Sequence, residues 1–223
     1  MTYRINEIFE TLQGEGTFTG VPSIFIRLQG CPVGCPWCDT QHTWEINSAD
    51  EVSVARMMDK SEASPHWATM SSDDIVELIK QRGYRAKHVV ITGGEPAMYD
   101  LRALGEALEA QGMRLQIETS GTYELLITPA TWVTVSPKLD MPGGYLVRSD
   151  CLSRADEIKH PVAMQKHVDA LDQLLKGQRL NADVVICLQP ISQRPRATEL
   201  AMKVCIERNW RLSVQMHKYL NIE

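Results

Sequence analysis

The chain has 223 residues, of which 43% are apolar, and its 23 basic and 28 acidic residues give a formal net charge of −5. This balance, without a long run of either charge, argues against a protein that coats nucleic acid or binds a membrane surface, because both need a basic face. No basic segment followed by an apolar stretch opens the sequence, and no window reaches the ~18 apolar residues of a membrane span. We therefore expect a soluble cytoplasmic protein that folds as a single domain over residues 1–223.

Short apolar runs in six parts of the chain predict buried β-strands. Their near-continuous Val, Ile and Leu content is typical of parallel strands that are covered on both faces. In chain order, the predicted strands are 23–29, 88–92, 114–119, 132–136, 183–189 and 211–215.

Amphipathic segments alternate with several of these strands. The first begins with Ser and Asp residues and ends at Gly83, and the second begins at Asp100 and ends at Gly112, as capped helices do. The predicted helices are 71–83, 100–112, 167–177 and 197–209. Strands alternating with helices imply right-handed βαβ units. The predicted fold class is therefore α/β, with a truncated, partial parallel (β/α) barrel of about six strands.

Two stretches show no clear period. Residues 45–70 are polar and partly aperiodic, which is typical of an insertion, and residues 140–166 give no assignable element. We assign neither stretch a function.

The six cysteines form two groups. In a reducing compartment we expect free thiols, metal ligands or catalytic groups, and seldom disulfides. The scattered cysteines, which we expect to be small buried hydrophobes, are Cys151, Cys187 and Cys205. The other three are Cys31, Cys35 and Cys38, with the spacing C-x3-C-x2-C.

The clustered cysteines directly follow the first predicted strand, and loops at the carboxyl ends of parallel strands are where α/β folds place their chemistry. Glycines and prolines interleave with the cysteines, so the loop is stiff and can still curl around one object. Three thiolates that converge repel one another unless a cation or cluster neutralises them. The spacing therefore implies a cofactor.

Two cofactors fit three clustered cysteines. Zinc would need His42 as a fourth ligand, although zinc ligands usually come as two pairs separated by a dozen residues or more. A [4Fe–4S] cluster normally takes four cysteines, one for each iron. Three cysteines leave one iron open, and an open coordination position is typical of a catalytic metal site.

The cysteine spacing, with the aromatic Trp37 before the last cysteine, resembles that of the radical S-adenosylmethionine (SAM) superfamily. Further segments resemble the 7-carboxy-7-deazaguanine synthase family, and the resemblance extends from about Arg4 to Ile222. The segments are TLQGEG (11–16), GVPSIFIRLQGCPVGCPWCDT (20–40), VVITGGEPAM (89–98), IETSGT (117–122), TVSPKL (134–139), LQPIS (188–192) and QMHKYLNIE (215–223).

The resemblance implies a lyase that converts 6-carboxy-5,6,7,8-tetrahydropterin to 7-carboxy-7-deazaguanine with loss of ammonia, on the route to 7-deazapurines such as queuosine. In that family SAM binds the open iron of a [4Fe–4S] cluster and is cleaved reversibly to a 5′-deoxyadenosyl radical, which takes hydrogen from C6 of the substrate. The resemblance also implies Mg²⁺, a flavodoxin-type reductant and a homodimer.

Family resemblance assigns the catalytic cluster to Cys31, Cys35 and Cys38. It implies SAM contacts from Trp37, Cys38, Asp39, Gly94, Glu95, Ser136, Pro137 and Lys138, with Ser120 as a further candidate on the ribose side. A carboxylate at position 95 suits the ammonium group of SAM, and an ammonium at position 138 suits its carboxylate or a ribose oxygen.

The resemblance also implies the substrate contacts. These are Leu12, Gln13, Gly14, Glu15, Arg27, Thr92 and Gln189, with His217 as a further suggestion. A guanidinium inside the otherwise apolar run 23–29 needs a partner, and we expect Arg27 to bind the substrate carboxylate. Thr40 resembles the Mg²⁺ ligand of the family, and a hydroxyl suits a hard cation that keeps much of its hydration.

Two other functions remain open on the sequence. A glycyl-radical-activating enzyme would share the cluster and SAM but have no pterin site. A zinc-bearing interaction module would have no catalytic activity.

Overall fold

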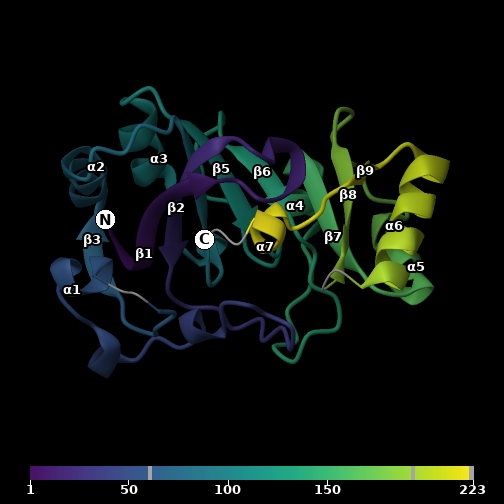
Figure 1. The fold of residues 1–223 in the computed structure, drawn as a ribbon, viewed down its shortest axis with the longest axis horizontal. Coiled ribbons are helices and arrows are strands. Elements are labelled where there is room, and N and C mark those ends of the chain that lie inside the picture. The colour runs from purple at the N-terminus through teal and green to yellow at the C-terminus, as the bar shows by residue number, and fades with distance from the viewer. Residues whose placement is uncertain (60–61, 192–193, 221–223) are drawn as a thin grey trace.

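The computed structural model describes residues 1–59, 62–191 and 194–220, and within them a nine-stranded sheet runs the length of the molecule (Figure 1). The order of the strands in the sheet is β3-β1-β2-β4-β5-β6-β7-β8-β9. Their bounds are β1 Thr2–Leu12, β2 Pro22–Leu28, β3 Ala68–Ser71, β4 His88–Gly93, β5 Arg114–Thr119, β6 Trp132–Val135, β7 Glu157–Val162, β8 Val185–Pro190 and β9 Arg211–Leu212.

The strands from β2 through β4 to β9 pair in parallel, whereas β1 pairs antiparallel with both β2 and β3. Because β3 and β9 are the two edges, the sheet does not close on itself. The α/β fold with a partial barrel that the sequence predicts is therefore confirmed.

Helices accompany the parallel strands, and α3, α4, α5 and α6 pack against β5, β6, β7 and β8 respectively. The helices are α1 Val54–Met58, α2 Ser72–Gln81, α3 Arg102–Glu109, α4 Ser149–Arg154, α5 Gln165–Leu175, α6 Pro195–Arg208 and α7 Met216–Leu220. Single 3₁₀ turns occur at η1 Gly16–Phe18, η2 Gln41–Thr43, η3 Ser48–Asp50 and η4 Pro96–Met98.

The predicted helices all form, and the first shows why its start is readable from sequence. The hydroxyl of Ser71 accepts a hydrogen bond from the Asp74 backbone N–H, and the Asp74 carboxylate accepts one from the Ser71 backbone N–H, which is a capping box. No helix within the described residues is long and apolar enough to cross a membrane.

The sequence prediction of about six strands omits β1, β3 and β7. Strand β7 carries Glu157, Lys159 and Pro161 at alternate positions, so it does not read as a continuous apolar run. Strand β3 lies at the end of the stretch 45–70 and adds part of that stretch to the sheet edge. Strand β9 is shorter than predicted and covers only residues 211–212.

The core consists mainly of aliphatic side chains from the strands and the helices packed on them. Cys151, Cys187 and Cys205 are buried, with exposed fractions of 1%, 1% and 6%, as predicted for small apolar residues. The lining of the cavity described below does not include these three cysteines.

A segment that follows β1 closes the end of the barrel at which the parallel strands begin. The Phe18 ring packs against the rings of His88 and Trp132, with centroids 4.6 and 5.0 Å away, and these residues begin β4 and β6. The backbone N–H of Thr17 donates to the carboxylate of the buried Glu157, at 2.6 Å. Residues 13–18 therefore form a plug, which leaves the barrel interior accessible from the carboxyl ends of the strands.

Candidate active site

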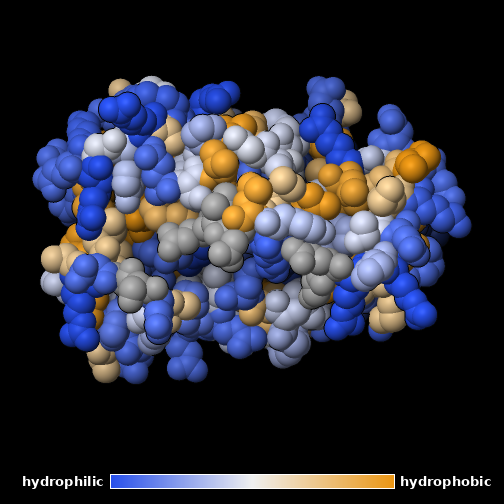
Figure 2. All heavy atoms as spheres, viewed as in Figure 1, coloured by the Kyte–Doolittle hydropathy of each residue, from blue (hydrophilic) through white to orange (hydrophobic). Residues whose placement is uncertain are grey.

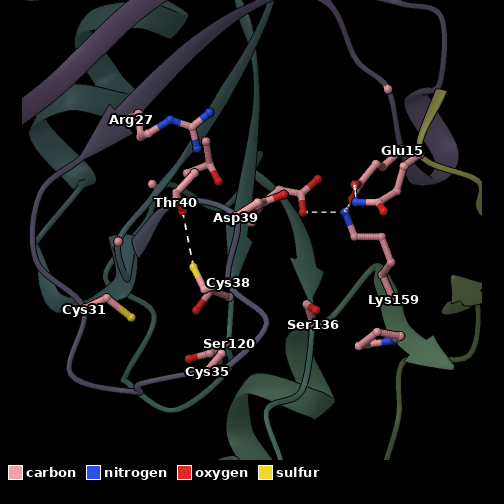
Figure 3. Close-up of a pocket in the computed structure, with 18 of the residues that line it drawn as sticks. Glu15, Arg27, Cys31, Cys35, Cys38, Asp39, Thr40, Ser120, Ser136 and Lys159 are labelled. Atoms are coloured by element: carbon pink, nitrogen blue, oxygen red, sulfur yellow. Dashed lines mark hydrogen bonds and ion pairs between the residues drawn. The ribbon is translucent and has the colours of Figure 1, made fainter. Parts of the chain in front are cut away.

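A cavity of about 350 Å³ lies inside the partial barrel and is lined by nearly all of the residues predicted for the site (Figure 3). The lining residues among those predictions are Leu12, Gln13, Gly14, Glu15, Arg27, Cys31, Cys35, Trp37, Cys38, Asp39, Thr40, Thr92, Gly94, Glu95, Ser120, Ser136, Lys138, Gln189 and His217. Pro137 is buried outside this lining. Residues 192 and 221–223 of the quoted segments lie outside the described residues.

The three clustered thiols surround one end of the cavity, below Arg27 and Thr40 in Figure 3. A zinc ion needs its ligand atoms within about 2.3 Å of one point. Within the described parts of the chain, no three His, Cys, Asp or Glu side chains converge in that way. A [4Fe–4S] cluster takes one thiolate at each of three separate irons. Thiols spread around one cavity end therefore fit the cluster.

Two of these thiols, Cys31 and Cys35, are protonated until a metal displaces their protons. Burial raises the pKa of Cys31 to about 11, and burial also raises the pKa of Cys35. A metal-bound thiol must be deprotonated, so metal uptake releases protons here. The Lys138 ammonium acts in the opposite direction on Cys35 and favours its thiolate.

Two glycine backbones bring the end of β4 against the start of the cysteine loop. The Gly94 N–H donates to the Leu28 carbonyl at 2.9 Å, and the Glu95 N–H donates to the Gly30 carbonyl at 2.7 Å. A Cβ on Gly94 would lie 2.0 Å from the Gly30 oxygen, which no side chain tolerates. Position 94 therefore accepts only glycine without a shift of the loop.

The Glu95 carboxylate is buried and saturated with hydrogen bonds. It accepts from the Ala97 N–H at 2.9 Å, from the Thr119 hydroxyl at 2.6 Å, and from both the N–H, at 2.8 Å, and the hydroxyl of Ser120. This residue thus ties the loop after β4 to the end of β5. A ligand ammonium at this carboxylate must share or replace one of these donors.

Arg27 projects into the cavity from β2, beside Thr92 on β4. Its Nε atom pairs with the Glu7 carboxylate, and its guanidinium lies 5.9 Å from the centre of the Phe9 ring. Glu7 and Phe9 therefore hold Arg27 from one side.

The opposite end of the cavity contains a charged group that the sequence analysis did not identify. Lys159 on β7 is 5% exposed, and its Nζ atom lies 2.6 Å from Glu15 and 2.6 Å from Glu118 (Figure 3). The amides of Gln189 and Gln215 donate to Glu15 at 3.3 and 2.9 Å. One ammonium and surrounding amides therefore stabilise two carboxylates that also line the cavity.

The two carboxyl groups respond differently to this environment. Burial alone raises the pKa of Glu15, but Lys159 and the donated hydrogen bonds lower it to about 2. Burial raises the pKa of Glu118, and the neighbouring Glu15 and Glu157 charges raise it further, whereas Lys159 lowers it. Burial lowers the pKa of Lys159, but the carboxylates outweigh it and raise the pKa above its usual range. Glu15 is therefore the firmly ionised partner.

Sequence reasoning missed several lining residues besides Glu118 and Lys159. The further missed residues are Phe9, Phe25, Val33, Trp44, Gly93, Thr119, Pro161, Ile191, Gln215 and Lys218. Glu118 lies within the quoted segment 117–122, and the alternation of polar side chains on β7 was the available signal for Lys159.

An open parallel sheet with three cysteines in the loop after its first parallel strand defines a radical SAM enzyme, and residues 25–138 match the family model described as the Radical SAM superfamily. Curated relatives extend the match to the whole chain. The 7-carboxy-7-deazaguanine synthase of Escherichia coli (strain K12) is 59% identical over 222 residues, covering 100% of both chains. The enzyme of that name from Synechocystis is 31% identical over 223 residues, covering 100% of this chain and 94% of its own.

A solved structure supports the same assignment. The crystal structure of QueE from Escherichia coli superposes with a TM-score of 0.95 at 58% sequence identity, covering 97% of this chain and 95% of the other. The chain belongs to the 7-carboxy-7-deazaguanine synthase family.

Loss of the Lys159 ammonium should destabilise the fold. Lys159→Met leaves two largely buried carboxylates without their cation, and breaking a buried ion pair costs about 3–5 kcal/mol. We expect a loss of this size in the free energy of unfolding at neutral pH, measured by urea denaturation of the cofactor-free chain. Lys166→Met, on the exposed face of α5, is the matched control.

The pH dependence separates this pairing from a packing effect. The Glu15 contribution is present above its unperturbed pKa of 4.5 and is lost as the pH falls through about 2. Without Lys159, burial raises the pKa of both carboxyls. The free energy of unfolding of Lys159→Met should therefore increase as the pH falls from about 7 to about 5. A deficit that stays constant over that range would contradict the pairing.

Proposed function

We propose that this chain converts 6-carboxy-5,6,7,8-tetrahydropterin to 7-carboxy-7-deazaguanine with loss of ammonia, a step of queuosine biosynthesis, using SAM that is cleaved reversibly at a [4Fe–4S] cluster. One observation supports this above all. A single cavity joins the three-cysteine loop to a polar group of amides and carboxylates suited to a pterin. We further propose a cytoplasmic, single-domain protein that forms a homodimer and takes its electron from a flavodoxin-type donor.

The cluster end of the cavity would hold both cofactors. The thiolates of Cys31, Cys35 and Cys38 would bind the cluster, which with SAM supplies the radical that takes hydrogen from C6 of the substrate. The Lys138 ammonium donates to the Ser136 hydroxyl at 2.8 Å, and both groups face the cavity. This pair suits the carboxylate or a ribose oxygen of SAM. Trp37, Asp39, Pro137 and the backbone at Gly94 complete our assignment.

The substrate would lie between Arg27 and the Glu15–Lys159 group. Arg27 would bind its carboxylate, while Gln13 and Glu15 would read the donors and acceptors of the pterin ring. Among the described residues, the buried Oε1 atom of Gln189 has no hydrogen-bond partner, although it belongs to a cavity-lining side chain. A buried acceptor without a donor is costly. A ring N–H of the substrate would satisfy it.

Thr40 and Arg27 would act together on the substrate carboxylate. The Thr40 hydroxyl lies 3.5 Å from the Cys38 sulfur and lines the cavity on the side of the cysteine loop. Mg²⁺ needs few protein ligands because it keeps several waters. We therefore assign one Mg²⁺ to this hydroxyl and the substrate carboxylate. At the opposite end of the cavity, the plug of residues 13–18 would restrict the access of water.

An anaerobic assay with metal analysis on the same sample tests the proposed function. Reconstituted protein should contain about four irons per chain and form the ring-contracted product and ammonia in the presence of reductant, SAM and Mg²⁺. Cluster and SAM cleavage without that product would indicate another radical enzyme, such as an activator of glycyl radicals. Stoichiometric zinc without iron would indicate an interaction module.

Arg27→Ala should raise the KM for the pterin substrate while the iron content stays the same. A charge-assisted contact contributes about 1.5–3 kcal/mol, which corresponds to about a 10- to 150-fold increase in KM. Arg102→Ala is the matched control, because that guanidinium is 58% exposed outside the cavity. A KM unchanged from that of the wild type would remove the assignment of Arg27.

Thr40→Val should abolish the response of turnover to Mg²⁺, because valine keeps the shape of threonine without the hydroxyl ligand. The measurement is a Mg²⁺ titration of product formation after iron content has been matched between proteins. Thr40→Ser keeps a hydroxyl and should retain the response. If the valine variant titrates as the wild type does, Thr40 is not the ligand.

A further inference from the structure

The cysteine loop is closed at its base by hydrogen bonds between its two arms. The Gly30 N–H donates to the Thr43 carbonyl at 2.7 Å, and the Cys31 N–H donates to the Trp44 carbonyl at 2.9 Å. The returning arm, residues 42–45, therefore runs beside the end of β2. The position of that arm determines where the loop carries its thiols and Thr40.

Gln29, immediately before the loop, holds the returning arm with its side chain. It is fully buried, and its Nε2 group donates to the carbonyls of His42 and Glu45, at 3.1 and 2.7 Å. Its backbone carbonyl accepts from the Tyr99 hydroxyl at 2.5 Å. Both N–H bonds of the amide are thus used on the arm, which fixes the orientation of the amide.

Asn6 holds Gln29 in turn, from a specialised position in β1. Ile5 faces Leu28 and Glu7 faces Arg27, so Asn6 is the extra residue of a β-bulge. Bulges redirect side chains and are frequent beside active sites. Here the fully buried Asn6 donates through Nδ2 to the Gln29 Oε1 atom at 2.8 Å.

Asn6 also contacts the stretch 45–70, which has no assigned role. Its Nδ2 group lies 2.9 Å from the Ser64 carbonyl and 3.2 Å from the His66 carbonyl. The segment is anchored next door by Trp67, which is 4% exposed and donates from its ring N–H to the Asn47 carbonyl at 3.2 Å. The amide pair therefore connects a packed outer segment to the cysteine loop.

We propose that Asn6 and Gln29 are positioning residues for the cysteine loop, and that residues 62–67 are the outer support against which they act. The pair holds the arm 42–45, and through it Thr40 and the cysteines, in one arrangement before any cofactor binds. Groups behind metal ligands typically change metal affinity or activity by about 10- to 100-fold when they are removed. The inference rests on the proposed function only in that the loop carries the cluster.

Gln29→Leu and Asn6→Leu test the proposal, since leucine keeps much of the volume without the amide. In the iron-free full-length chain, hydrogen exchange of the amides in residues 38–45 should become faster in both variants. After anaerobic reconstitution, the electron paramagnetic resonance spectrum of the reduced cluster should change, and the dissociation constant of SAM should rise about tenfold or more. Asn47→Ala is the control, because its exposed side chain accepts from the Ala49 N–H at the start of η3 and lies outside the Asn6–Gln29 pair.

Gln29→Asn addresses the risk that the leucine variants do not fold. The shorter amide keeps its polarity but reaches fewer of the same partners, so we expect smaller changes of the same sign. A lower melting temperature with unchanged exchange in residues 38–45 and an unchanged spectrum would show a merely structural role and overturn the proposal. Absence of iron from the wild type would contradict the proposed function and leave the exchange result standing.

Discussion

Lys159 lies between Glu15 and Glu118 inside the partial barrel. Desolvating one ammonium and two carboxylates is favourable only when the charges pair closely and amides satisfy the remaining lone pairs. Gln13, Gln189 and Gln215 supply those amides. The same group binds the segment 213–217 through Gln215, and that segment binds the plug 13–18 through the Gly16 N–H on the Ser213 hydroxyl and the Met216 N–H on the Gly14 carbonyl.

The opposite end of the cavity depends on the close approach of Gly94 to Gly30, which forces the loop after β4 against the start of the cysteine loop. Apolar side chains gather outside the polar interior, around α7 on the face in view (Figure 2). Two unrelated constraints thus define the two ends of one cavity. One is the ionic group of Lys159 with Glu15 and Glu118, and the other is the backbone contact of Gly94 with Gly30. That separation suits a reaction in which one group generates a radical and another reads the substrate.

The sequence predicted those parts of the fold that obey one simple rule. Helix α2 has an N-terminal capping box, and strands such as β4 are continuous apolar runs, so both could be located. Strand β7 was missed because only two of its six residues, Ile158 and Val162, are aliphatic. Many site residues were found because they lie in quoted family segments, although others in the same segments, such as Glu118, were missed. Lys159 gave no such signal. It lies outside every such segment, and its partners Glu15 and Glu118 are distant in the chain.

This failure has a physical basis that applies to other barrels with cavities. A parallel strand that borders a packed core is apolar on both faces. A strand that borders a ligand cavity needs polar residues at alternate positions on its inner face, as Glu157 and Lys159 lie on either side of the apolar Ile158. In an α/β sequence such alternation resembles an antiparallel edge strand or a loop. Where a central strand is expected from the order of elements, the same alternation instead indicates which strand borders the cavity.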